Sequence, residues 1–272
     1  MNKIIWINWF QGWDNAPEIS CKCLESWKYY NPEWQIILLD ESNMDKYCDL
    51  KKTLPGLNTN YISLGDLLRL SLLALHGGVW VDSTLWCNKP LDKWLEFDDS
   101  FFFTRKDRLM DTWLMGAHSH SYLMRQYYKI AIKWWRYRIS ETDQFEQKYA
   151  WMHMLLNTLI QQDSKVAEIV KNFDHIDVMH DIWNRQNGYG WRGRSGHFFT
   201  PYYEYFYKPT TDSFRRRIDS KIDPVYKLTY KEKTEWKNPS KRGIHPGDEK
   251  IFLETPRDSQ LSYLLNTIEL SI

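Results

Sequence analysis

The amino-acid sequence predicts an α/β fold, and three observations carry this prediction. Strand, helix and strand patterns alternate over residues 3–40, a long apolar helix leads through two glycines into a short strand, and later strand-like segments are followed by helical ones. Alternation of this kind builds a largely parallel sheet with helices on its faces. The chain has 272 residues and no linker rich in Pro, Gly or Ser, so we expect a single domain over residues 1–272.

The N-terminal region predicts the first three elements. Residues 3–9 (KIIWINW) are β-branched and aromatic, which is typical of a buried strand. Pro17 suits a first helical position, and apolar residues then recur at helical spacing until Asn31 and Pro32 end the helix. The apolar run 34–40 (WQIILLD) predicts the second strand.

The middle of the chain predicts a buried helix that leads into a strand. Residues 61–76 (YISLGDLLRLSLLALH) are apolar on nearly every face, as in a helix covered on all sides. Gly77 and Gly78 follow and suit a left-handed C-terminal cap. Residues 79–82 (VWVD) predict a short strand, in which we expect Trp80 to lie in the core behind Asp82.

The remaining segments are mixed. We expect strands over 101–104, 112–116 and 224–229, helices over 121–138, 144–162 and 260–268, and a loop over 183–200.

The overall composition excludes several classes of protein. Lys and Arg number 36 against 35 Asp and Glu, so the net charge of +1 does not favour a nucleic-acid partner. The cysteines are too few for a disulfide scaffold, and we expect them to be reduced and packed: Cys21, Cys23, Cys48 and Cys87. The first strand runs directly into Gln11 and Gly12 without the small-residue cleavage site of a signal peptide, and no apolar run is long enough to cross a membrane. We therefore expect a soluble, cytoplasmic protein.

Two charged residues interrupt the apolar helix. Asp66 and Arg69 are three positions apart and so share one face, and they are the only charges between Tyr61 and Leu75. A buried charge needs a partner or a ligand. Two interpretations stay open: a structural pair, with Ser63 and Asp66 capping the helix and Arg69 bound to Asp66, or a ligand site.

Asp82 ends the predicted strand 79–82, and the carboxyl ends of strands in α/β sheets are where ligands bind. Thr84 lies two residues further on, and residues i and i+2 of an extended chain point to the same side. A carboxylate and a hydroxyl are thus offered together. Mg²⁺ and Mn²⁺ accept a few protein oxygens beside water and phosphate, so the two side chains suit a divalent cation.

The order of these motifs resembles a known family. KIIWINWFQGWDNAPEI, NPEWQIILLD, GDLLRLSLLALHGGVWVDSTLW and VYKLTYK are similar to the capsular polysaccharide synthesis proteins. That group shares an Asp-x-x-Arg, Gly-Gly, Asp-x-Asp block with glycosyltransferase family 32 and the glucosylating toxins. The resemblance is clear over residues 1–120, patchy over 120–220, and returns near the C-terminus. It implies a GT-A fold, a Rossmann-like α/β domain with added helices, whose core is about 1–120 and 220–235 with a helical and loop insertion about 120–220.

The resemblance implies a glycosyltransferase. It would move a sugar from a nucleotide-diphosphate-sugar donor to a polysaccharide or lipid-linked oligosaccharide acceptor, in capsule or surface glycan synthesis. Family 32 relatives retain the anomeric configuration, so we expect retention, which requires no enzymic base. An inverting enzyme would need one, and Asp111 is then the position to test.

The resemblance also assigns roles to residues. Asp82 would hold Mn²⁺ or Mg²⁺ on the donor diphosphate, Asp66 and Arg69 would bind hydroxyls of the transferred sugar, and Trp9 would stack on the nucleobase. Thr84 stands in place of the second Asp of the family's motif. One negative charge fewer predicts weaker metal binding.

A basic segment near residue 230 offers a further charge. Lys227 and Lys231 in VYKLTYK are candidates to neutralise charge that develops on the diphosphate. The alternative is an ordinary strand edge, where lysine is common. The loop 183–200 is a candidate lid over the donor, with a plain surface loop as the alternative.

Residues 127–138 combine aromatic and basic side chains. Two interpretations of Trp134 and Trp135 stay open. Either they contact a bilayer surface, which would attach the protein peripherally to the inner face of the membrane, or they pack in the core. We favour the core because the amphipathic signal is short.

Two other functional classes stay open. The 15 Trp residues and the Thr84 departure also suit a catalytically silent carbohydrate-binding protein of the same fold. A nucleotidyltransferase is disfavoured because the sequence lacks a Gly-rich triphosphate loop, and the absence of a GxGxxG fingerprint disfavours hydride transfer.

Overall fold

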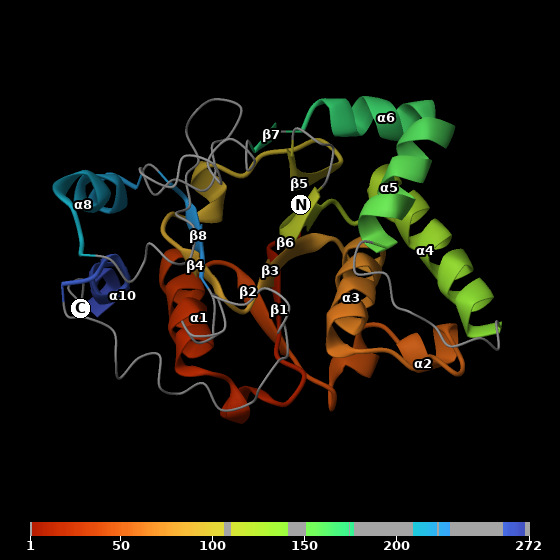
Figure 1. Ribbon diagram of the computed structural model, residues 1–272, viewed down its shortest axis with the longest axis horizontal. Helices are drawn as coiled ribbons and strands as arrows, with labels where there is room; N and C mark the ends of the chain where they lie inside the picture. The colour runs from red at the N-terminus through yellow and green to blue at the C-terminus, as the bar shows by residue number, and fades with distance from the viewer. Residues whose placement is uncertain are drawn as a thin grey trace. The chain divides into compact units, whose positions relative to one another are not determined.

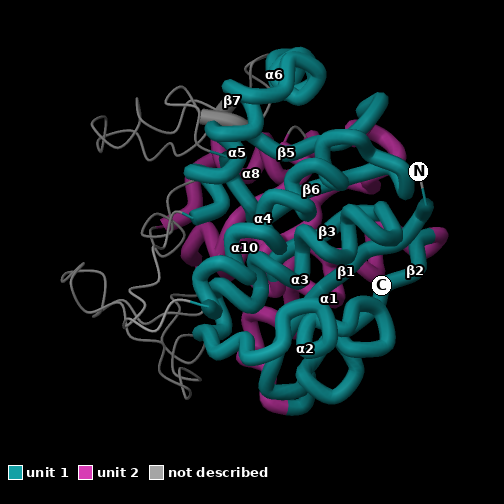
Figure 2. The backbone as a smooth tube through the Cα atoms, turned by 90° about the vertical axis from the view of Figure 1, so that its right-hand side faces the viewer, with its two compact units in different colours: residues 1–14, 34–82, 97–174 teal, residues 15–33, 83–96, 175–272 magenta. Residues whose placement is uncertain are grey.

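The computed structural model (Figure 1) describes residues 2–105, 110–140, 151–173, 175–176, 209–221, 223–228 and 258–269. The chain forms two compact units, each assembled from distant segments (Figure 2). Unit 1 contains residues 1–14, 34–82 and 97–174, and unit 2 contains residues 15–33, 83–96 and 175–272. The predicted single domain, with its core and insertion boundaries, stays a prediction.

A mixed sheet lies at the centre of unit 1. Its strands in this unit follow the order β2-β1-β3-β6-β5, with β1 at Ile4–Asn8, β2 at Gln35–Leu39, β3 at Gly78–Asp82, β5 at Ser100–Arg105 and β6 at Met110–Ala117. β1 pairs in parallel with β2 and with β3, so that Asn8 lies opposite both Leu39 and Asp82. β6 is antiparallel to β3 and β5. The parallel strands and the helices between them confirm the α/β class.

The helices of unit 1 gather on one side of this sheet (Figure 1). They are η2 (Met44–Lys46), α2 (Leu50–Thr53), α3 (Tyr61–Leu75), α4 (Tyr122–Ser140), α5 (Trp151–Gln162) and α6 (Ser164–Lys171). α3 packs on β3 and β6, α4 packs on α3, and α5 packs on α4. Since α3 is covered by the sheet and by α4, its leucines from Leu67 to Leu73 are fully buried. This explains why its sequence is apolar on nearly every face.

Both ends of α3 are set by local chemistry. The Asn60 side chain accepts a hydrogen bond from the Ser63 backbone N–H at 2.9 Å, so Asn60 is the N-cap. The suggested capping pair of Ser63 and Asp66 is therefore wrong, because Ser63 lies inside the first turn. At the other end Gly77 and Gly78 have φ of +71° and +88°, as the left-handed cap requires.

In unit 2, α1 (Glu18–Tyr30) packs on β4 (Leu85–Cys87), and β4 pairs antiparallel with β8 (Val225–Lys227). The Trp27 indole donates to the Leu85 carbonyl at 2.6 Å, which fixes the helix on the strand. The remaining elements are η3 (Leu91–Lys93), β7 (His175–Ile176), α8 (Asp212–Asp219) and α10 (Gln260–Glu269). η1 (Trp13–Asn15) lies where the chain passes from unit 1 to unit 2. A second apolar core joins α1, α8 and α10 to β4 and β8.

The predicted strands and helices are confirmed wherever the structure describes them. Pro17 is the N-cap of α1 and not its first helical residue. The predicted helix over 144–162 is observed from Trp151, and the segment before it lies outside the described residues, as does the predicted loop over 183–200.

The cysteines are packed, as expected. All four cysteines are free, and all but Cys21 are buried. No described helix is long and apolar enough to span a bilayer.

Trp134 and Trp135 of α4 pack against the core of unit 1. Trp135 is 1% exposed and meets Trp151 edge-on at 5.7 Å between ring centroids. Trp134 stacks on the same ring at 5.8 Å and 9°. The core interpretation of these two residues is therefore confirmed.

Candidate active site

Three elements of unit 1 bring charged groups together. α3 carries Asp66 and Arg69, and β3 ends at Asp82. One guanidinium nitrogen of Arg69, Nη2, lies 3.5 Å from the Asp66 carboxylate and 3.4 Å from that of Asp82. The other, Nη1, donates to the backbone carbonyl of Thr112 in β6 at 2.5 Å. The three charged residues that the sequence singled out thus form one cluster. It contains the suggested ion pair of Asp66 with Arg69 and a second ion pair of Arg69 with Asp82.

Burial sets the electrostatics of the cluster. Asp66 and Arg69 are each 8% exposed, whereas the Asp82 side chain is 26% exposed. Burial raises the pKa of Asp66 to about 6, the guanidinium of Arg69 opposes that rise, and the charge of Asp82 adds to it. Because burial outweighs the one cation that the two carboxylates share, Asp66 holds its proton more tightly than an exposed aspartate does.

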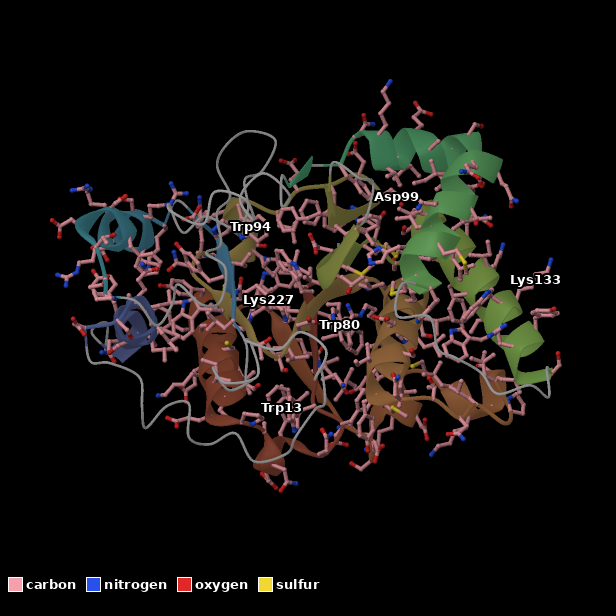
Figure 3. The ribbon with its side chains drawn as sticks, in the orientation of Figure 1. Trp13, Trp80, Trp94, Asp99, Lys133 and Lys227 are labelled. Carbon is pink, nitrogen blue, oxygen red and sulfur yellow. The ribbon has the colours of Figure 1, made fainter. Side chains whose placement is uncertain are left out.

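Trp80 of β3, which is labelled in Figure 3, completes the cluster. Its indole N–H donates to the Asp82 carboxylate at 3.1 Å, and the Arg69 guanidinium carbon lies 5.1 Å from its ring centroid. A cation at this distance over an indole face is stabilised by the ring quadrupole. Trp80 is 3% exposed, as expected of a core residue, yet it also orients both charged partners. The alternation of side chains along β3 already places Trp80 and Asp82 on one side.

Tyr127 and Asp111 lie near the cluster, and of the two only Asp111 was singled out by the sequence, as the base that an inverting enzyme would need. Tyr127 of α4 is fully buried, and burial followed by the nearby charge of Asp66 raises its pKa well above the ordinary range. Asp111 precedes Thr112 in β6 and is 5% exposed. The carbonyl of Thr112 is a backbone acceptor, so no side-chain pattern predicts its contact with Arg69.

Trp9 follows β1 at the edge where β3 ends. Its backbone N–H donates to the Leu39 carbonyl at 2.9 Å, and its side chain is partly exposed. Since Asn8 pairs with Asp82, Trp9 lies at the carboxyl edge of the parallel strands. This placement is the one that a base-stacking role needs, and the role itself stays a prediction.

The other predicted residues belong to unit 2. Thr84 directly precedes β4 and is 5% exposed, and the Lys227 ammonium donates to its hydroxyl oxygen at 2.8 Å. Lys231 lies outside the described residues.

The predicted metal ligands have protein partners of the wrong kind for a divalent cation. Mg²⁺ and Mn²⁺ need oxygen acceptors directed at them. The Asp82 carboxylate already accepts from Trp80 and faces Arg69, and the Thr84 hydroxyl accepts from an ammonium. No group of three His, Cys, Asp or Glu side chains is placed to hold a metal in the part of the chain that the structure describes. These contacts leave the expected ion untested, and a metal cofactor stays a prediction.

Comparison with known families identifies the class of protein. The family model described as "Capsular polysaccharide synthesis protein" matches residues 1–187. The chain belongs to the capsular polysaccharide synthesis protein family, as the ordered motifs predicted.

A curated relative links the chain to a glycosyltransferase by sequence. The "O-glycosyltransferase braB" of Annulohypoxylon truncatum is 30% identical over 95 residues, which cover 30% of this chain and 23% of the relative. The chain thus matches less than a quarter of that protein's length.

Several solved structures are similar in part. "PaToxG Glycosyltransferase" has a TM-score of 0.42 and 16% identity, over 62% of this chain and 73% of its own. The apo-form glycosyltransferase GlyE of Streptococcus pneumoniae TIGR4 has a TM-score of 0.42 and 9% identity, over 100% of this chain and 64% of its own. A glycosyltransferase involved in the glycosylation of the major capsid of PBCV-1 has a TM-score of 0.35 and 13% identity, over 64% of this chain and 80% of its own.

Proposed function

We propose that the protein is a glycosyltransferase that takes a sugar from a nucleotide-diphosphate-sugar donor. The observation that carries the proposal is the cluster of Asp66, Arg69 and Asp82 at the carboxyl edge of parallel strands, in a chain of the capsular polysaccharide synthesis family. Ligands of α/β sheets bind at this edge. Family membership further favours the GT-A type of donor-binding domain.

The cluster suits the hydroxyl groups of a sugar. Carboxylates accept hydrogen bonds and a guanidinium donates them, so both kinds of partner are present for hydroxyls, which do both. We assign hydroxyl binding to Asp82, the more exposed carboxylate, with Arg69 and Asp66 behind it. Trp80 acts as a positioning residue because it holds the Asp82 carboxylate by its indole N–H.

Trp9 is our candidate for stacking on the nucleobase. It follows β1 at the same edge of the sheet as Asp82, and an indole face stacks on any base. The donor's base and sugar would then lie along one edge of unit 1.

For the acceptor we propose a polysaccharide or a lipid-linked oligosaccharide, in capsule or surface glycan synthesis, as the family's description suggests. We also propose that the anomeric configuration is retained. Asp111, the residue that an inverting enzyme would use as a base, is 5% exposed within β6 and is poorly presented to an acceptor.

Peripheral attachment to a membrane is supported by one face of α4. Arg125, Lys129, Lys133 and Arg136 are exposed at helical spacing, with Lys133 on the outer side of the helix in Figure 3. Residues 122–140 contain no Asp or Glu. A cationic face of this kind is attracted to anionic lipids, and sedimentation with phosphatidylglycerol vesicles but not with phosphatidylcholine vesicles is the expected result. A cytoplasmic location stays a prediction.

Donor binding tests the proposal. UDP-, GDP- and dTDP-sugars are added with EDTA or with Mn²⁺ while the melting temperature is measured. A ligand that binds only the folded state stabilises it, by about 2.7 kcal/mol at 100 times its dissociation constant. We expect one base class to raise the melting temperature, and Asp82→Asn to reduce that shift, whereas Glu168→Gln at an exposed position of α6 keeps it. No shift with any donor would contradict the proposal.

A further inference from the structure

We propose that Asn8 is a further sugar-binding residue, whose side-chain amide binds a hydroxyl of the transferred sugar beside the Asp82 carboxylate. The inference rests on the proposed function, because the transferred sugar belongs to the nucleotide-sugar donor. The residues that carry it all belong to unit 1.

Asn8 is the last residue of β1 and faces the same side of the sheet as the charged cluster. The register pairs Asn8 with Asp82 and, two residues earlier, Trp6 with Trp80. Trp6 and Trp80 share one apolar core with the leucines of α3, so these positions of both strands face α3. Because side chains two residues apart in a strand point to the same side, Asn8 and Asp82 face α3 as well. The 3.4 Å contact between Asp82 and Arg69 of α3 agrees with this placement.

The neighbours of Asn8 within this core are apolar. Leu39 lies opposite it in β2, Trp6 precedes it by two residues, and Phe10 follows it by two. These three side chains are at most 7% exposed, whereas Asn8 is partly exposed. Leu or Val would suit such a position, so an amide here needs a polar partner to explain it.

The carbonyl oxygen of the Asn8 amide has no such partner in the described ranges of the chain. Oδ1 is buried and accepts no hydrogen bond there. A buried acceptor without a donor destabilises the folded state, because it has lost its hydrogen bonds to water. No contact within this part of the protein therefore explains the amide, whereas a polar ligand at the carboxyl edge of the strands does. The terminal torsion of asparagine is broad, so the amide can turn either its N–H groups or its oxygen to that ligand.

A neutral amide suits a place beside the charged cluster. Arg69 already contacts both Asp66 and Asp82, so an acidic side chain at position 8 would add a third negative charge near one cation. Asparagine brings N–H donors and an acceptor without charge. A sugar hydroxyl both donates and accepts, so it can donate to the Asp82 carboxylate and accept from the Asn8 amide.

The competing explanation is that the amide only stabilises the end of β1. Two substitutions of nearly the same shape separate the explanations. Asn8→Val removes the polar group, and Asn8→Thr keeps a hydroxyl that donates and accepts. If the amide serves a ligand, Asn8→Val removes a buried acceptor without a donor and should melt at or above the wild-type temperature when no ligand is present. If the amide is structural, Asn8→Val should melt below it.

The experiment measures dissociation constants by titration calorimetry on the full chain, in EDTA and in Mn²⁺. The probes are UDP-glucose, UDP-N-acetylglucosamine, GDP-mannose and dTDP-rhamnose, each beside its nucleoside diphosphate. For the nucleotide-sugar that binds, Asn8→Val should weaken binding by about tenfold and Asn8→Thr by less, since only the latter keeps a hydrogen-bonding group. Both variants should bind the nucleoside diphosphate within about twofold of wild type, because the amide meets the sugar alone. Asn58→Val, at an exposed position of unit 1, is the control and should bind both ligands as wild type does.

Several results would overturn the inference and leave the proposed function standing. They are an unchanged nucleotide-sugar affinity in Asn8→Val, equal affinities in Asn8→Val and Asn8→Thr, an equal loss for the nucleotide-sugar and its nucleoside diphosphate, and a lower melting temperature of Asn8→Val without ligand. If none of the nucleotide-sugars binds the wild type in EDTA or in Mn²⁺, the proposed function itself fails.

Discussion

Replacing Asp66 by Asn should change how the stability of the protein depends on pH. The pKa of Asp66 is raised from 3.8 to about 6, chiefly by burial. A raised pKa means that the folded state binds this proton more tightly than the unfolded state does. Between the two pKa values the folded state holds more protons, so the free energy of unfolding falls as pH rises.

The structure gives the size of the effect. A shift of about two units corresponds to about 3 kcal/mol, and Asp66 is buried enough that solvent screens it little. The free energy of unfolding of the wild type, relative to Asp66→Asn, should therefore fall by up to about 3 kcal/mol between about pH 4 and pH 7. Carboxylates remote from Asp66 titrate alike in both proteins and cancel in the difference.

Urea unfolding across this pH range, with EDTA present, measures the difference directly. Glu168→Gln at an exposed position controls for the removal of any carboxylate. A wild type that gains stability relative to Asp66→Asn as pH rises would refute the reasoning, because it would show that Arg69 outweighs burial and holds Asp66 ionised. A difference that does not change with pH would refute it equally.

Three further substitutions follow from the structure. Gly78→Ala should lower the free energy of unfolding, measured in urea, by about 3 kcal/mol, because φ is +88° and a Cβ would lie 2.7 Å from the Ile4 carbonyl oxygen. A loss below about 1 kcal/mol would contradict this. Gly65→Ala should instead stabilise by about 0.5–1 kcal/mol, because its Cβ would meet only side-chain atoms at 3.8 Å or more inside a helix, and a loss of stability would count against this. Trp80→Phe should lower the free energy of unfolding by about 1 kcal/mol and the kcat of donor hydrolysis about tenfold, since Asp82 loses its indole donor. An unchanged kcat would show that Trp80 does not position Asp82.

Local patterns were sufficient to predict most of the fold that is described. The all-round apolar sequence of α3 predicted a helix covered on every side, and it lies between the sheet and α4. The cap of α3 was missed because Asn60 and Ser63 are both good capping residues, and only the backbone geometry chooses between them.

The site was predictable only in part. Asp66, Arg69 and Asp82 are charges in apolar surroundings, which is a strong signal. The contact of Arg69 with the Thr112 carbonyl depends on how β6 pairs with β3, and backbone acceptors leave no mark in a sequence. The hydrogen bond between Lys227 and Thr84 joins residues 143 positions apart, so the periodicity of the sequence does not predict it.

Turnover of the donor tests the central claim most directly. The measurement is release of nucleoside diphosphate from UDP-, GDP- and dTDP-sugars, with EDTA or Mn²⁺, by the wild type and by Asp82→Ala. The account predicts release from one base class and a loss of about 100-fold or more in Asp82→Ala. Glycan binding without turnover of any donor would instead leave a carbohydrate-binding protein, and pyrophosphate release from a nucleoside triphosphate would indicate a nucleotidyltransferase. Either result would contradict the account.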